Sequence, residues 1–164
     1  ARNGFTLLEI LVVIVIISIV AGVAVITINR NQNNQFKTLA NQLANTLTLA
    51  EQEAMLRPAT IGLAFTPHAF QFYVYQRDAK NQKNIWQTID QSPLGLHTLP
   101  SNTQITLKIL GKNIPANGTP QLIISANGDL TPFVILIGKT ETTPYYQVTG
   151  KANGEVKSEP FSAE

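Results

Sequence analysis

The carboxylate of Glu9 is the side chain in this chain whose position most requires a chemical role. It directly precedes a segment of nineteen residues, Ile10 to Ile28, that carries no charge. As a helix, nineteen residues at about 1.5 Å each reach roughly 28 Å, close to the roughly 30 Å hydrocarbon core of a bilayer. An unpaired charge in hydrocarbon costs several kcal/mol, so an acid at the mouth of such a segment is usually kept for a function. We therefore expect a membrane-spanning helix with a functional carboxylate near its start.

Other side chains offer little from which to build a catalytic centre. The chain has no cysteine and two histidines, His68 and His97, which fall in different predicted loops. Their spacing matches no zinc motif, and no complete glycine-rich phosphate loop is present. We expect both histidines to be solvent-exposed loop residues. The sequence predicts a protein that is not an enzyme and that holds no metal and no cofactor.

Three interpretations of the N-terminus compete. A secretory signal peptide has an apolar stretch of about 7–15 residues and a small-residue cleavage site, and here the stretch is too long. A plain membrane anchor explains the length but not Glu9. The third interpretation is a resemblance: Gly4-Phe5-Thr6-Leu7-Leu8-Glu9-Ile10 is similar to the class III signal of type IV pilins and type II secretion pseudopilins.

This resemblance implies a processing site and a location. A prepilin peptidase would cleave between Gly4 and Phe5 and methylate the new Phe5 amine, so that residues 1–4 are the remnant of a longer leader. Residues 5–28 would form the transmembrane and assembly helix, with a single pass through the bacterial inner membrane. The later residues would lie in the periplasm, and Arg2 suits the cytoplasmic side.

The resemblance also implies a pairing for Glu9. After cleavage, the Phe5 amine is positive and Glu9 is negative, four residues apart on one helix face. Glu9 could pair with its own amine or with that of a neighbouring subunit, and either pairing relieves the cost of two isolated charges. The alternative is that Glu9 lies in the headgroup zone and is merely solvated.

The helix is predicted to continue past the membrane, over residues 29–57. A polar stretch, residues 29–35, marks the exit into water. After it, apolar residues recur every three or four positions, which predicts an amphipathic helix with one face on a domain. Pro58 ends it. The alternative is two helices with a flexible linker at residues 29–35. The apolar positions are Phe36, Leu39, Ala40, Leu43, Leu47, Ala50 and Ala54.

Residues 58–164 read as an antiparallel β-rich domain, so the fold class is α+β. Short β-rich runs alternate with turn residues. Residues 133–137 are apolar throughout and predict a central strand, and residues 90–103 predict a long loop. Asn117-Gly118, Asn127-Gly128 and Asn153-Gly154 favour hairpin turns. The predicted strands are Thr60–Phe65, Phe70–Gln76, Ile85–Ile89, Gln104–Leu110, Gln121–Ser125, Phe133–Gly138, Tyr145–Thr149 and a short one near Val156.

A long helix packed on such a domain most resembles the H-type minor pseudopilins of bacterial type II secretion (the GspH family). The similar segments are Leu39–Leu63 and Ser125-Ala126-Asn127-Gly128. The resemblance implies a low-abundance subunit near the tip of a periplasmic pseudopilus that helps to export folded proteins. Its partners would be other minor and major pseudopilins, the prepilin peptidase and the inner-membrane assembly platform.

Two alternatives to this function remain open. One is a minor type IV pilin involved in pilus assembly or DNA uptake. DNA binding needs a clustered basic patch, and the local cluster of Arg77, Lys80 and Lys83 is interrupted by Asp78. With a net charge of only +2, we expect no nucleic-acid partner. The other alternative is a membrane-anchored periplasmic domain without a role in a filament.

Overall fold

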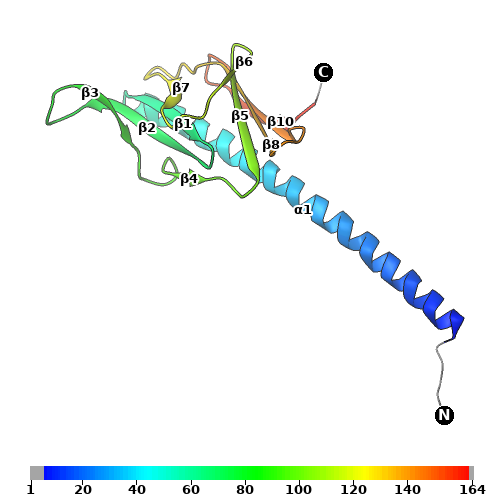
Figure 1. The fold of residues 1–164 in the computed structure, drawn as a ribbon. Helices are drawn as coiled ribbons and strands as arrows, with labels where there is room; N and C mark the ends of the chain where they lie inside the picture. The colour runs from blue at the N-terminus through cyan, green and yellow to red at the C-terminus, as the bar shows by residue number, and fades with distance from the viewer. Residues whose placement is uncertain (1–5, 163–164) are drawn as a thin grey trace. The chain divides into compact units, whose positions relative to one another are not determined.

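The structure, a computed structural model, describes residues 6–162, and for residues 23–32 it describes the backbone alone. The chain divides into two units, Ala1–Gln35 and Phe36–Glu164. One helix, α1 (Leu7–Leu56), contributes to both units (Figure 1). Residues 29–35 are assigned to this helix, in agreement with the predicted continuation past residue 28.

The second half of α1 supplies one wall of the domain core. All seven apolar positions predicted from the spacing are buried, and Ala44 joins them. Small residues toward the end of this stripe, Ala50 and Ala54, are fully buried, which lets the strands approach the helix closely. About five turns of helix thus bury an apolar face against the sheets, and this burial rather than intrinsic propensity stabilises the helix there.

Ten strands follow the helix within the described residues. They form two antiparallel sheets, the first with order β3-β2-β1-β7 and with β4 also paired to β2, and the second with order β10-β9-β8-β5-β6. The bounds are β1 (Thr60–Thr66), β2 (Ala69–Arg77), β3 (Asn84–Thr88), β4 (His97–Thr98), β5 (Thr103–Ile109), β6 (Lys112–Ile114), β7 (Pro120–Ile124), β8 (Phe133–Lys139), β9 (Tyr146–Gly150) and β10 (Val156–Pro160).

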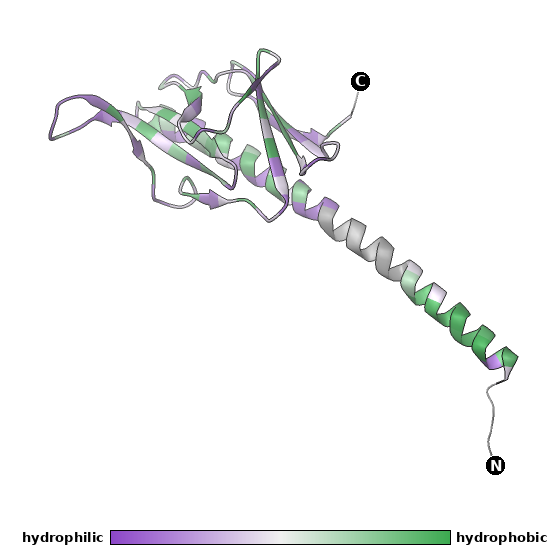
Figure 2. Cartoon of the chain, viewed as in Figure 1, coloured by the Kyte–Doolittle hydropathy of each residue, from purple (hydrophilic) through white to green (hydrophobic). Residues whose placement is uncertain are grey.

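Both sheets place alternate side chains in the same core as α1. In the first sheet, Phe65 of β1 faces Phe70 of β2 in the register, and both are buried. In the second, β8 is the central strand, as predicted, with Ile135 and Ile137 fully buried. Figure 2 shows hydrophobic and hydrophilic residues mixed along the strands of both sheets. The alternation has the period of two expected for strands with one solvated face.

The structure corrects several predictions in the loops. Residues 90–103 are not one loop, because β4 lies within them and pairs with β2. The short strand β6 was also missed. The Asn153-Gly154 turn does close the β9–β10 hairpin, with Gly154 at φ 85°. The turn at Asn127-Gly128 likewise joins antiparallel segments, because Ile124 and Leu130 form a bridge across it and the Ser125 N–H donates to the Asp129 carbonyl oxygen at 2.8 Å. Beyond this turn the chain passes from β7 in one sheet to β8 in the other.

Candidate assembly site

The N-terminal site begins at the limit of the described residues. Gly4 and Phe5, the predicted processing residues, lie outside them. Glu9 stands in the first turn of α1. Its backbone N–H donates to Oγ1 of Thr6 at 3.3 Å and also to the Thr6 carbonyl oxygen at 3.1 Å. Thr6 therefore caps the helix, and a glutamate three residues later completes the sequence pattern of a capping box.

This cap gives Glu9 a local role that the sequence predictions missed. A carboxylate in the first turn is favoured by the positive end of the helix dipole, typically by about 0.3–1 kcal/mol. The signal was present in the sequence, since Thr6-Leu7-Leu8-Glu9 fits the capping-box spacing. Among the ion pairs between described residues, none involves Glu9. Its carboxylate is therefore free, within this part of the chain, to meet a cation from outside it.

The first turns of α1, on both sides of Glu9 in the sequence, expose their apolar side chains in all directions. Leu7 is 83% exposed and Ile10 is 52% exposed, and Val20 still exposes 63%. The hydroxyl of Ser18 donates to the carbonyl oxygen of Ile14 at 2.8 Å, so this polar group is satisfied inside the helix. A helix that is apolar all round needs a partner that covers it, either protein or lipid. In Figure 2 the first turns of α1 have mostly the hydrophobic colour, with one hydrophilic band near the start of the helix.

Among the residues whose side chains are described, no helical segment meets the length and apolar content of a membrane span. The predicted transmembrane segment, residues 5–28, includes positions outside these residues, and it stays a prediction.

The two histidines differ in their surroundings. His68 is exposed in a turn, as predicted. His97, in contrast, is half-buried in β4 and stacks on Phe70, with ring centroids 4.7 Å apart and planes 11° apart. Its Nε2 lies 2.7 Å from the carbonyl oxygen of Pro93, and its Nδ1 lies 3.0 Å from Nε2 of Gln42 on α1. The prediction of an exposed loop histidine is therefore wrong for His97, which joins helix, strand and loop.

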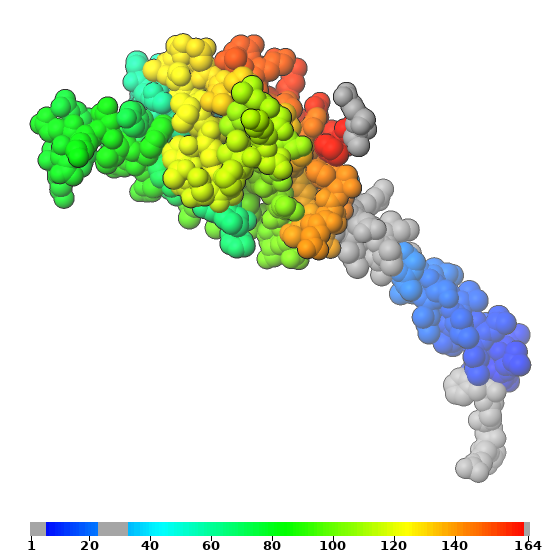
Figure 3. Space-filling model, turned by 45° about the horizontal axis from the view of Figure 1, so that its top comes forward, coloured from blue at the N-terminus to red at the C-terminus, as the bar shows by residue number. Residues whose placement is uncertain are grey.

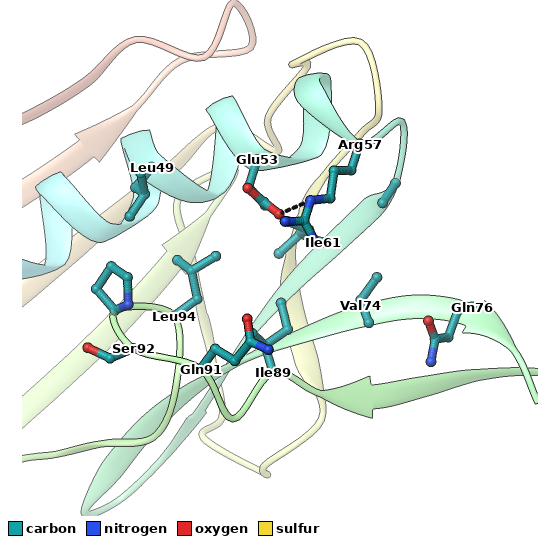
Figure 4. Close-up of a pocket in the computed structure, with 12 residues that line it drawn as sticks. Leu49, Glu53, Arg57, Ile61, Val74, Gln76, Ile89, Gln91, Ser92 and Leu94 are labelled. Atoms are coloured by element: carbon teal, nitrogen blue, oxygen red, sulfur yellow. Dashed lines mark ion pairs between the residues drawn. The ribbon is translucent and has the colours of Figure 1, made fainter.

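A groove of about 550 Å³ lies between the end of α1 and the first sheet. Figure 4 shows Glu53 of α1 and Arg57, which directly follows this helix, on one side and the loop from Gln91 to Leu94 on the other. Glu53 and Arg57 form an ion pair with an Nε···Oε1 distance of 2.9 Å, and the arginine side chain is 79% exposed. An exposed pair of this kind stabilises a helix by about 0.3–0.5 kcal/mol. The groove holds no histidine and no second carboxylate, so it lacks a general acid–base pair.

Metal ligation has no geometric support in the described part of the chain. No group of three histidine or carboxylate side chains comes together within it. Several acidic residues of the domain instead pair with cations or with amides, as Asp129 does with the Asn127 side chain at 2.7 Å.

Known proteins resemble this chain in both its N-terminal segment and its domain. Residues 1–25 match the prokaryotic N-terminal methylation motif, and residues 39–154 match the family described as type II transport protein GspH. The type II secretion system protein H of Aeromonas hydrophila is 26% identical over 93% of this chain and 89% of its own length. The protein of the same name from Pseudomonas aeruginosa is 30% identical over 81% of each chain.

Solved structures show the same fold. The minor pseudopilin EpsH from the type 2 secretion system of Vibrio cholerae has a TM-score of 0.67 at 20% identity, covering 79% of this chain and 99% of that one. The solution structure of Escherichia coli GspH has a TM-score of 0.60 at 19% identity and covers 78% and 89% of the two chains. These matches favour the H-type family over the alternative of a DNA-uptake pilin. The chain belongs to the type II transport protein GspH family and is a minor pseudopilin of type II secretion.

Proposed function

We propose that this minor pseudopilin is a low-abundance subunit near the tip of a periplasmic pseudopilus, where it helps to drive the export of folded proteins. The proposal rests on the exposure of the side chains in the first half of α1. Between residues 6 and 22 every described side chain is exposed, and Glu9 is the one charged residue among them. Such a surface is stable only when lipid or the helices of other subunits cover it. Its role is structural and not enzymatic.

Processing precedes assembly in this proposal. The prepilin peptidase cleaves between Gly4 and Phe5 and methylates the Phe5 amine, which the match to the methylation motif over residues 1–25 supports. The apolar segment anchors the chain in the inner membrane with a single pass, and the β domain lies in the periplasm. Other minor and major pseudopilins and the inner-membrane assembly platform are the partners.

Glu9 is the proposed assembly contact. Its carboxylate pairs with the amine of Phe5, either in its own chain or in a neighbouring subunit. In a low-dielectric environment two opposite charges are stable only as a pair, because each alone carries a desolvation cost of several kcal/mol. The pairing would therefore align an incoming helix with those already assembled.

Substitutions at residues 6 and 9 separate the charge of Glu9 from its capping role. Glutamine keeps the side-chain length and can complete a capping box, but it has no charge. We expect Glu9→Gln and Glu9→Ala to lower incorporation into the pseudopilus by about tenfold or more, equivalent to roughly 1.4 kcal/mol, while both proteins remain membrane-bound. Thr6→Ala is the control, because it removes the cap and keeps the charge. Crosslinking to neighbouring pseudopilins in membranes measures incorporation.

The outcomes distinguish the two roles. If Glu9→Gln is incorporated as well as the wild type, the charge has no role in assembly and the proposed pairing is wrong. If Thr6→Ala is as defective as Glu9→Gln, the defect comes from the helix start. Processing has its own test: we expect Gly4→Leu to block cleavage, whereas Gly22→Leu should be cleaved normally, since a Cβ at Gly22 meets no atom within 4 Å. Efficient cleavage of Gly4→Leu would contradict the proposed site.

A further inference from the structure

The strand β3 forms an open edge of the first sheet. Within the described residues it pairs with β2 on one side and with no strand on the other. In Figures 1 and 3 the β2–β3 hairpin projects beyond the rest of the domain, so nothing drawn covers this edge. An open edge presents unpaired N–H and C=O groups, and proteins usually protect it with charges or proline.

The register identifies which backbone groups face outward. Ile89 N–H donates to the Phe72 carbonyl at 3.0 Å, and Asp78 N–H donates to the Lys83 carbonyl at 2.8 Å. Because bonded and non-bonded pairs alternate along an antiparallel ladder, the backbone groups of Ile85 and Gln87 also point toward β2. Those of the three remaining residues point outward at the free edge. The outward-facing residues are Asn84, Trp86 and Thr88.

This edge lacks the usual protection. From Asn84 to Thr88 there is no charged residue and no proline, and Ile85 is 41% exposed. Five residues match the common length of a strand. The edge is therefore suited to accept a further strand from outside the chain.

An aromatic surface flanks the edge on the outer face of the hairpin. The rings of Trp86 and Tyr75 lie with centroids 5.0 Å apart, and Tyr75 is 43% exposed. The Trp86 ring extends across to β1, where a Cβ on Gly62 would lie 2.8 Å from it and 2.7 Å from the Cβ of Pro120. Because Gly62 has no side chain, the indole of Trp86 can pack directly over it. Trp86 is half-buried as a result. A strand added at β3 would place its own side chains beside this surface.

The charged residues near the β2–β3 turn determine which kind of strand could add to the β3 edge. The turn of the hairpin carries three cations, Arg77, Lys80 and Lys83, and one acid, Asp78. Both carboxylate oxygens of Asp78 are used within the turn, by the Lys80 N–H at 2.9 Å and by the Asn81 side chain at 3.1 Å. The Arg77 guanidinium is hydrogen-bonded to Gln82 and not to an acid. The end of the edge next to Lys83 therefore carries positive charge. Among the described residues, no carboxylate forms an ion pair with these cations.

We propose that β3 is a docking edge for an extended, acidic segment of another protein, which adds to the first sheet as a strand with its acidic end beside Lys83. Backbone hydrogen bonds to Asn84, Trp86 and Thr88 hold the segment, and the Tyr75–Trp86 surface takes its apolar side chains. A second copy of this chain fits less well, because its own β3 is followed by a single acid, Asp90. The proposal is independent of Glu9 and of the membrane helix.

Trp86 provides the assay, since it is the only tryptophan of the chain. The full-length protein in detergent is titrated with a short synthetic peptide in which valine and threonine alternate and glutamates stand at one end. We expect a saturable blue shift of the tryptophan emission. A matched peptide with lysines in place of the glutamates should bind about tenfold more weakly at low salt, and high salt should reduce this difference.

Variants of Thr88 test the edge itself. Thr88→Pro removes an N–H that points outward and leaves the bonds to β2 intact, so we expect the binding to be lost. Thr88→Val is the matched control, because it keeps the N–H and the shape of the side chain. Should Thr88→Pro fold poorly, two methylated peptides replace it, one methylated on the odd and one on the even amide nitrogens. Only one of these two sets of N–H groups can point toward β3, so we expect one peptide to lose binding and the other to keep it.

Charge variants complete the test. Lys83→Glu should weaken binding of the acidic peptide by roughly three- to tenfold, as expected for exposed charges. Lys112→Glu, the same change on β6 in the other sheet, should not alter it. Unchanged binding by Thr88→Pro or by both methylated peptides, or no saturable shift at all, overturns the proposal. A shift that depends on protein concentration alone would assign the edge to a second copy, and one caused by duplex DNA would assign it to nucleic acid.

Discussion

Replacement of His97 by alanine should destabilise the domain formed by residues 36–162. In the structure this histidine touches three elements: it stacks on Phe70 of β2, accepts or donates hydrogen bonds with Gln42 of α1, and contacts the Pro93 carbonyl oxygen. Alanine removes all three interactions together. Because Phe70 is 1% exposed, the lost ring also uncovers part of the core.

The magnitude follows from the geometry. A stacked pair with centroids 4.7 Å apart is worth about 0.5–1.5 kcal/mol beyond area burial. Each hydrogen bond adds about 0.5–1.5 kcal/mol, and exposed ones fall at the lower end. We therefore expect His97→Ala to lower the free energy of unfolding by about 2–3 kcal/mol, and the melting temperature by about 10 °C for a domain of this size. His97→Phe keeps the stack and loses both bonds, so its cost should be about 1 kcal/mol.

Unfolding by urea, followed by circular dichroism of the full-length protein in detergent, measures these values. Gln42→Ala is combined with His97→Ala as a control, and we expect almost no further loss because the partner of Gln42 is already gone. The reasoning is refuted if His97→Ala changes stability by less than about 0.5 kcal/mol, the level typical of surface substitutions. It is also refuted if His97→Phe is as damaging as His97→Ala, since the stack would then contribute nothing.

Three further predictions concern the second sheet. Thr103 has a buried hydroxyl without a partner among the described residues, so Thr103→Val should stabilise the domain by about 1 kcal/mol in the same urea assay. A Cβ at Gly150 would overlap the ring of Phe133, so Gly150→Ala should destabilise it by about 1–3 kcal/mol, and an unchanged midpoint would contradict this packing. Hydrogen bonds from Lys151 and Lys157 lower the pKa of Glu155 to about 2. Their stabilising effect is present above the ordinary carboxylate pKa of 4.5 and is lost as the pH falls through about 2. The melting-temperature difference between wild type and Glu155→Gln should therefore be small at neutral pH and vanish in strong acid.

The helix and most strands could be predicted because their signals are local. The spacing of Phe36, Leu43 and Ala50 alone defines a helix face, and all three are buried. Alternation along Phe70, Phe72 and their neighbours likewise identifies β2. The predicted ends of these strands differ from those of the structure by at most one residue, because the exact strand ends depend on pairing with neighbours and not on composition.

The missed features depend on contacts between distant residues. The sequence places His97 in a loop because Pro93, Gly95 and Pro100 surround it, whereas two of its partners, Gln42 and Phe70, lie far away in the sequence on α1 and β2. The two residues of β4 are too few to show a period of two. The division of the strands between two sheets, and hence the open edge of β3, follows from pairing order, which no short pattern encodes. For Gly4 and Phe5 the sequence motif remains the source of the predicted roles.

Mass spectrometry of the mature N-terminus tests the central claim most directly. The protein is expressed from its complete gene in a strain with a functional prepilin peptidase, isolated from membranes, and its terminal peptide is sequenced. If the chain is assembled through a processed helix, the mature protein begins at Phe5 and carries one methyl group on the amine. A chain that retains residues 1–4, or that begins after the apolar segment, would leave Glu9 without its partner amine and would contradict the proposed assembly.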